Sequence, residues 1–287
     1  MRTLRLIAFV VIVGTITAVA LVVWKRGSSL WDNTFGPSNG CSASVDGHNV
    51  QLDTSQGQYA SIIAAVAVQR GLPPRAVSIA LATAYQESKI QNLPGGDRDS
   101  LGLFQQRPSM GWGTHDQLMD PVYATNAFYN ALVKITNYTS IGIGVAAQDV
   151  QHSADNSGDS YQQHADDARA LASALTGYSP GGFSCVVVND NSYGNAADVM
   201  SAIQGSYGSA VSPQRSVREN VTVPVESSTA GQRLGWSVAQ YSVAMAAQLH
   251  IKSVLFNGKK WVTGKNSSKD WTSDRSASST TVSIVMQ

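Results

Sequence analysis

The sequence is poor in charge. Asp, Glu, Lys and Arg make up 14% of its 287 residues, against about 25% in an average soluble protein, and the formal net charge is +1. Serine, threonine, asparagine, glutamine and glycine take their place, which is common on surfaces outside the cytosol. The chain has no basic stripe that would neutralise phosphates, so the composition excludes a nucleic-acid-binding protein.

Metal-ligand spacings are missing as well. None of the five histidines has a partner at metal-site spacing, so we interpret them as structural or surface residues and expect no metal and no cofactor; they are His48, His115, His152, His164 and His250. The two cysteines, Cys41 and Cys185, stand at the edges of one segment. This placement favours a disulfide, which persists in oxidising compartments; the alternative is two free thiols.

The longest uncharged run begins at Leu6 and ends at Trp24, and its 19 residues suffice to cross a hydrocarbon layer of about 30 Å. A cleaved signal peptide is the alternative, but the small-x-small pattern at residues 18–20 lies inside the run. We therefore expect residues 1–26 to be an uncleaved single-pass membrane anchor. The flanking positive charges balance, so they do not decide its orientation. A disulfide would place the chain after Arg26 on the extracytoplasmic side.

The remaining chain predicts a mainly α protein with a small α+β module at its C-terminus. Residues 27–54 are polar and indicate a stalk, residues 55–188 a helical domain, residues 189–232 a linker with one helix, and residues 233–287 an accessory domain. Apolar periodicity and turn residues place the elements. We expect helices at 56–70, 74–88, 119–135, 143–154 and 160–175, with Asp120 as the N-cap of the third and Pro121 as its first residue. A strand-like run at 183–188, a helix at 196–203 and a helix at 235–251 follow, and then a hairpin turning at Asn257 and Gly258 and a strand at 280–287.

The second expected helix ends on a carboxylate. Val77, Ala80, Leu81 and Ala84 recur at helical spacing and predict a stripe that faces the core. Glu87 falls about 70° from the centre of that stripe, at the border between core and solvent. Partial burial and the negative end of the helix dipole both favour its uncharged form, which can act as a general acid. Taken alone, a glutamate at a helix end is usually a solvated surface residue.

A glycine-rich loop follows this carboxylate, and glycine lets a backbone approach a ligand closely. We expect the loop to form one wall of a cleft. Gln105 and Gln106 carry amides that suit hydroxyl and N-acetyl groups. Trp112 is either a flat surface for a sugar ring or a core residue. Asp97 and Asp99 are typical of turns that close on their own side chains.

Several linked motifs resemble one known family. Glu87 and Ser88, followed by Gly102 to Gln105, resemble the ES…GLMQ signature of lytic transglycosylases and goose-type lysozymes. The longer pattern is similar to a bacterial cell-surface branch of this lysozyme-like superfamily, and it reads ESKIQNL, GDRDSLGLFQQRPSMGWGT, DPVYATNAFYNAL and AAQDVQHSA. The resemblance covers about residues 56–177.

The resemblance implies a lysozyme-like helical domain that acts on peptidoglycan. Glu87 would protonate the glycosidic oxygen between N-acetylmuramic acid and N-acetylglucosamine, and would then act as the base that lets the muramyl 6-hydroxyl close a 1,6-anhydro ring. No second carboxylate is needed in this scheme. The residues expected to bind the substrate are Ser88, Gly102, Phe104, Gln105, Gln106, Trp112 and Tyr161.

Two alternatives stay open. In a hydrolytic muramidase, Asp97 or Asp99 would be the second carboxylate and would activate a water molecule. In a non-catalytic subunit, the same domain would only bind glycan strands, inside an envelope-spanning secretion or conjugation apparatus. The expected partners are therefore peptidoglycan strands, the membrane through the N-terminal run, and proteins of such an apparatus, with no nucleic acid.

Overall fold

The computed structural model describes residues 39–153, 157–188, 192–217, 220–264 and 271–287. The expected membrane anchor lies outside these residues. None of the helices in these ranges combines the length and the apolar character that a membrane span requires.

A three-stranded antiparallel sheet begins the described chain. Strands β1 (Gly40–Val45) and β2 (His48–Leu52) form a hairpin, and β1 also pairs with β3 (Phe183–Val186). Cys41 lies opposite Cys185 in this pairing, and the two form a disulfide. The predicted disulfide is thus confirmed, and it indicates an oxidising compartment. The expected stalk is wrong for residues 40–52, because they form this hairpin.

Helices make up most of the chain between β2 and β3. The long ones are α2 (Thr54–Gln69), α3 (Pro74–Ser88), α5 (Pro121–Leu132), α6 (Ile143–Gln151) and α8 (Ala165–Leu175), with the short α4 (His115–Met119), η1 (Pro108–Met110) and α7 (Asp159–Gln162) between them. Asp120 caps α5 through the backbone N–H of Val122, as predicted. The stripe on α3 is buried, also as predicted.

A six-stranded antiparallel sheet completes the fold. Its strands are β4 (Gln214–Arg215), β5 (Val221–Pro224), β6 (Ile251–Phe256), β7 (Lys259–Val262), β8 (Thr272–Ser273) and β9 (Thr281–Met286), in the spatial order β4-β5-β9-β6-β7-β8. The helices of this part are α9 (Ala196–Tyr207), η2 (Gly208–Ala210), α10 (Thr229–Ala244) and α11 (Ala246–Leu249). The helix expected within the linker at 189–232 is confirmed as α9. The expected linker is wrong where the chain forms β4 and β5, because these strands belong to the sheet.

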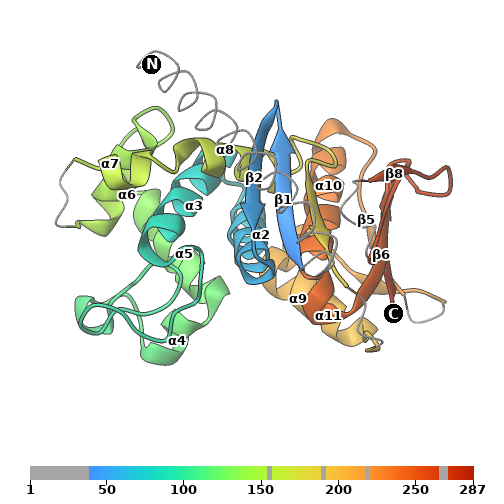
Figure 1. Ribbon diagram of the computed structural model, residues 1–287, viewed down its shortest axis with the longest axis horizontal. Helices are drawn as coiled ribbons and strands as arrows, with labels where there is room; N and C mark the ends of the chain where they lie inside the picture. The colour runs from blue at the N-terminus through green and yellow to red at the C-terminus, as the bar shows by residue number, and fades with distance from the viewer. Residues whose placement is uncertain (1–38, 154–156, 189–191, 218–219, 265–270) are drawn as a thin grey trace, which may run out of the picture. The chain divides into compact units, whose positions relative to one another are not determined.

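The prediction of a mainly α fold is wrong as well. The described residues form an α+β structure with two antiparallel sheets, and the chain from Asn39 to Gln287 makes one compact unit. Helix α10 joins its parts, because it packs against α2, α8 and β3 and also against β6 and β9 (Figure 1). The hairpin at Asn257 and Gly258 and the last strand were predicted, and they are β6, β7 and β9. The prediction missed β1, β2, β4, β5 and β8, because short strands leave little local signal.

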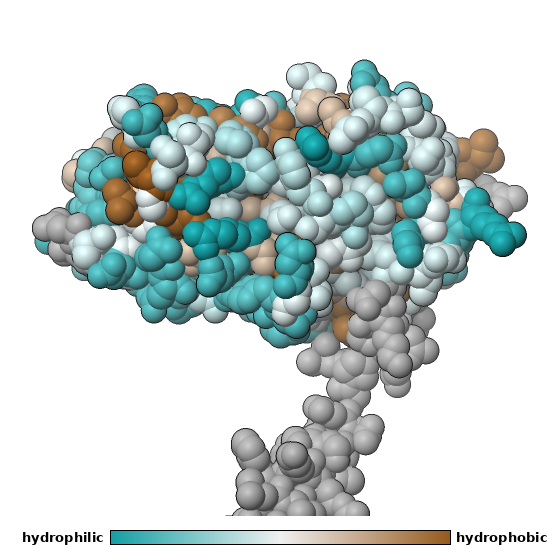
Figure 2. Space-filling view, turned by 90° about the horizontal axis from the view of Figure 1, so that it is seen from above, coloured by the Kyte–Doolittle hydropathy of each residue, from teal (hydrophilic) through white to brown (hydrophobic). Residues whose placement is uncertain are grey.

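The surface agrees with the low charge of the sequence. Figure 2 shows one face of the molecule mostly in teal and pale colours, with brown, apolar residues in small separate groups. Large apolar side chains that are exposed include Met110, Val133, Val145 and Tyr178. Scattered apolar residues of this kind are normal on a folded protein.

Candidate functional site

Glu87 lies in the wall of a cavity of about 830 Å³. It stands in the last turn of α3, which ends because Lys89 and Ile90 adopt positive φ angles of 58° and 56°. The residues of the helix stripe are buried, whereas Glu87 is half-buried. This is the border position that the helical periodicity predicts, and it gives the carboxyl both a protein environment and access to the cavity.

Tyr161 fixes the orientation of this carboxyl. Its side chain is buried, and its hydroxyl donates a hydrogen bond of 2.7 Å to Oε1 of Glu87. The tyrosine comes from the short helix α7, which packs closely on α6: a Cβ added to Gly144 would lie 2.2 Å from the carbonyl oxygen of Gly158. Because Oε1 already accepts this hydrogen bond, Oε2 is the oxygen left to exchange a proton with a ligand.

Three of the residues expected to bind substrate hold the loop instead of lining the cavity. Ser88 is buried and donates to the carbonyl oxygen of Leu103 at 2.7 Å, which ties the end of α3 to the loop. Gly102 has a φ of +73°, and an added Cβ would lie 2.5 Å from the carbonyl oxygen of Leu118. Phe104 is buried and stacks on Phe128 with 4.6 Å between ring centroids. These residues hold the loop in place and do not themselves line the cavity.

Gln105, Gln106 and Trp112 do line the cavity. Gln105 has a φ of 47°, and its side chain rests on Gly96, where an added Cβ would lie 1.7 Å from Oε1 of Gln105. Gln106 is 2% exposed and donates to the carbonyl oxygen of Ala124, while its Oε1 has no hydrogen-bond partner within the described chain. Trp112 is half-buried. Two amides and one aromatic face therefore border the space next to Glu87.

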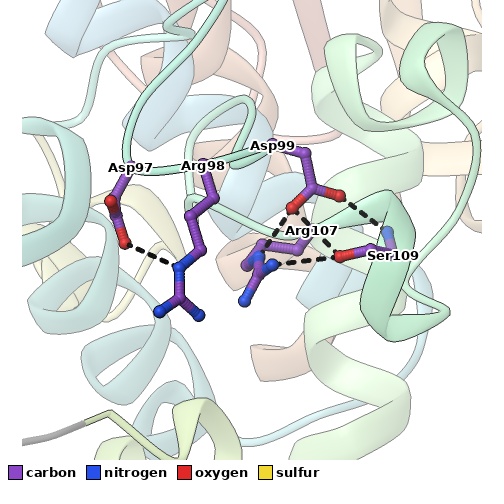
Figure 3. A network of polar contacts seen from close by, with 5 residues as sticks. All are labelled: Asp97, Arg98, Asp99, Arg107 and Ser109. Carbon is purple, nitrogen blue, oxygen red and sulfur yellow. Dashed lines mark hydrogen bonds and ion pairs between the residues drawn. The ribbon is translucent and has the colours of Figure 1, made fainter.

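The two aspartates of the loop have different surroundings. Asp99 accepts hydrogen bonds from Arg107 at 2.7 Å and from the backbone N–H of Ser109 at 2.8 Å (Figure 3). These bonds, first the one from the Ser109 backbone and then the one from Arg107, hold the pKa of Asp99 well below its usual range. Asp99 does not line the cavity, so it braces the loop. Asp97 lines the cavity and is exposed, and its Oδ2 lies 3.9 Å from Nε of Arg98.

The cavity has a second wall that the sequence analysis did not select. It comes from the end of α6 and contributes Asp149, Gln151 and His152, while Lys134 stands just after α5. Gln151 also donates to the carbonyl oxygen of Phe104 at 2.9 Å, which ties this wall to the loop. The sequence could have indicated this wall, because Asp149, Gln151 and His152 lie inside the AAQDVQHSA motif. That motif supported the family resemblance, but no site residue was chosen from it.

This arrangement suits proton transfer to a polar, ring-shaped ligand. One half-buried carboxyl is oriented by a tyrosine, amides on the cavity wall can bond hydroxyl or acetamido groups, and an aromatic side chain offers a flat apolar surface. Within the described ranges, no group of three or more His, Cys, Asp or Glu side chains is placed to hold a metal ion.

Comparison with models of protein families finds no match to this chain, and a search of curated protein sequences finds none either.

Proposed function

We propose that this protein cleaves the β-1,4 bond between N-acetylmuramic acid and N-acetylglucosamine in peptidoglycan, as a lytic transglycosylase. The observation that carries the proposal is the 2.7 Å hydrogen bond from Tyr161 to Glu87, in the wall of a cavity that Gln105, Gln106 and Trp112 also line. A module that only bound glycan would have no need of an oriented carboxyl at this place. The resemblance of its motifs to lytic transglycosylases supports the same activity.

The reaction needs one carboxyl group. Oε2 of Glu87 donates its proton to the glycosidic oxygen, and the bond from that oxygen to C1 of the muramyl residue breaks. Positive charge develops on C1 and the ring oxygen. The muramyl 6-hydroxyl then attacks C1, and its proton passes to the Glu87 carboxylate. The carboxyl is regenerated, a 1,6-anhydro ring has formed, and no water is consumed.

The hydrolytic muramidase stays a second candidate because Asp97 lines the same cavity. In that reaction Asp97 would take a proton from water, and the product would have a reducing end. Asp99 is a poorer candidate for this role, since its oxygens are taken up by Arg107 and Ser109.

The proposal includes a location. The disulfide indicates an oxidising compartment, where peptidoglycan is found. We propose that the uncharged run from Leu6 to Trp24 anchors the chain in the cell membrane, with the folded part on the extracytoplasmic side. Partner proteins of an envelope-spanning apparatus would then meet it there.

The experiment is product analysis on purified cell wall. We expect the wild type to release fragments whose mass shows a 1,6-anhydro end, and Glu87→Gln to lower the rate by a factor of about 10² to 10⁴. Glu226→Gln is the matched control, because Glu226 is exposed and belongs to the C-terminal part. Reducing ends would indicate the muramidase. Glycan binding without any released fragment would indicate a binding subunit and overturn the proposal.

A further inference from the structure

The cavity lies where three helices end. Glu87 is in the last turn of α3, Ala131 is in the last turn of α5, and Asp149 is in the last turn of α6. The helices contain 15, 12 and 9 residues respectively. The last turn of each of the three helices therefore contributes a residue to the lining of this one space.

The C-terminal end of a helix carries a partial negative charge, about half an elementary charge, because its last carbonyl groups have no partner within the helix. Three such ends around one cavity create a negative potential inside it. Asp149 strengthens this potential. It is exposed at the cavity wall, and within the described residues it forms no hydrogen bond or ion pair that would neutralise it.

The other charges of the cavity act less strongly or in the opposite direction. Arg107 is neutralised by Asp99, and Asp97 lies close to Arg98. Lys134 lines the cavity just after α5 and is exposed, and its positive charge opposes that of Asp149. It has no ion pair in the described part of the chain. His152 caps α6 and is exposed. Asp149 is thus a carboxylate of the cavity wall that has no ion pair within the described residues.

We propose that Asp149 and the ends of these helices stabilise the positive charge that develops on the muramyl ring when Glu87 donates its proton. This inference rests on the proposed glycosidic cleavage and deepens it. The reaction leaves the sugar with a cationic C1 and ring oxygen, and a fixed negative potential acts on that charge without any rearrangement of groups. Glu87 remains the one group that transfers protons, while Asp149 and the helix ends act only through their negative charge.

Kinetics on soluble peptidoglycan fragments test the proposal. Asp149→Asn removes the charge and keeps the shape of the side chain, so we expect kcat to fall about 10-fold while KM stays within about 2-fold. Asp149→Glu should restore most of the rate. Lys134→Gln removes the opposing charge, and we expect kcat to rise about 2-fold or more. Asp159→Asn, an exposed change on α7, is the control.

The outcomes separate this inference from the proposed function. If Glu87→Gln abolishes cleavage while Asp149→Asn keeps the wild-type kcat, the role of Asp149 is wrong and the proposed function stands. If Asp149→Asn and Asp149→Glu lose activity equally, the side chain acts through its shape and the electrostatic role is also wrong. A switch of the Asp149→Asn product from reducing to anhydro ends would make Asp149 the base of a hydrolase and would overturn the inference.

Discussion

At the scale of single residues, three carboxylates of one segment acquire different roles from their neighbours. Glu87 accepts a hydrogen bond from a tyrosine and lines the cavity, whereas Asp97 lines the cavity and is exposed to solvent. Asp99 accepts hydrogen bonds from an arginine and from a backbone N–H. The sequence indicated Glu87 through its place on the helix, but it did not separate the two aspartates. Their difference depends on Arg107 and Ser109, which reach Asp99 only after the loop has folded.

Tyr161 should be a positioning residue for Glu87. Tyr161→Phe removes the hydroxyl that donates to Oε1 and keeps the buried ring, so we expect stability to fall by about 1 kcal/mol. The cleavage rate should fall by about 10- to 100-fold, because the carboxyl loses its fixed orientation. Rates and urea denaturation of both proteins give the two numbers. A rate that falls only in proportion to the unfolded fraction would show that the hydroxyl serves the fold alone.

Asp99 should affect the loop and leave the chemistry unchanged. A carboxyl whose folded pKa is lowered stabilises the protein fully above its unfolded pKa, near the usual value of 3.8, and loses this contribution as the pH falls toward the lowered pKa. We therefore expect Asp99→Asn to lower the melting temperature by a constant amount between pH 5 and pH 8, and by less below about pH 4.

The measurement is the melting temperature of wild type and Asp99→Asn across this pH range, together with the end group of the released sugar. Asp99→Asn should give the same end group as the wild type, because Asp99 lies outside the cavity lining. A changed end group would make Asp99 a catalytic base and would contradict its role as a brace.

At the scale of elements, the site depends on how the end of α3 joins the loop. Ser88 bonds the carbonyl oxygen of Leu103, and Leu101 pairs with Gln106 in an antiparallel bridge. Between these contacts the chain passes Gly102 in a left-handed conformation, directly against the carbonyl oxygen of Leu118. The loop is therefore fixed by contacts to its backbone, and Gly102 packs against α4 rather than against a ligand.

Gly102→Ala should consequently destabilise the protein by distorting this loop. The added methyl group would lie 2.5 Å from the carbonyl oxygen of Leu118, and the alanine backbone would have to adopt a φ of +73°. Together these effects should lower the free energy of unfolding by at least about 2 kcal/mol. Gly95→Ala is the matched control, because nothing lies within 4 Å of its added Cβ. Urea denaturation measures both. Equal stability of the two variants would contradict the close contact at Gly102.

The sequence predicted the elements that have local signals. Periodic apolar residues and the Asp120–Pro121 start located α3 and α5, and Asn257 and Gly258 located the turn between β6 and β7. The hairpin of β1 and β2 was missed, although Asp46 and Gly47 both adopt the positive φ angles that its turn requires. Its strands are short and polar on one side, and β3, which completes the sheet, follows more than a hundred residues later.

At the scale of the whole molecule, the C-terminal part is bonded into the helical part. Gln240 of α10 is fully buried, accepts from the backbone N–H of Phe183 at 2.8 Å and donates to the carbonyl oxygen of Ala174 at 2.6 Å. Trp261 and Trp271 donate to carbonyl oxygens of β3. The backbone groups of Phe183 and Cys185, at and near the disulfide, thus form hydrogen bonds with side chains from after position 235.

Gln240→Leu should therefore destabilise the entire unit. It leaves the N–H of Phe183 buried without a partner and removes one of the hydrogen bonds to the carbonyl oxygen of Ala174, which still accepts from the N–H of Gly177. We expect this loss to cost about 1–3 kcal/mol. Gln248→Leu, an exposed change on α11, is the control. Because the two parts share these bonds, calorimetry should show a single transition in both the wild type and Gln240→Leu, at a lower temperature in the variant, with glycan cleavage lost in that same transition. Two transitions, with cleavage retained after the first, would mean that the C-terminal part unfolds independently and that α10 does not support the cavity.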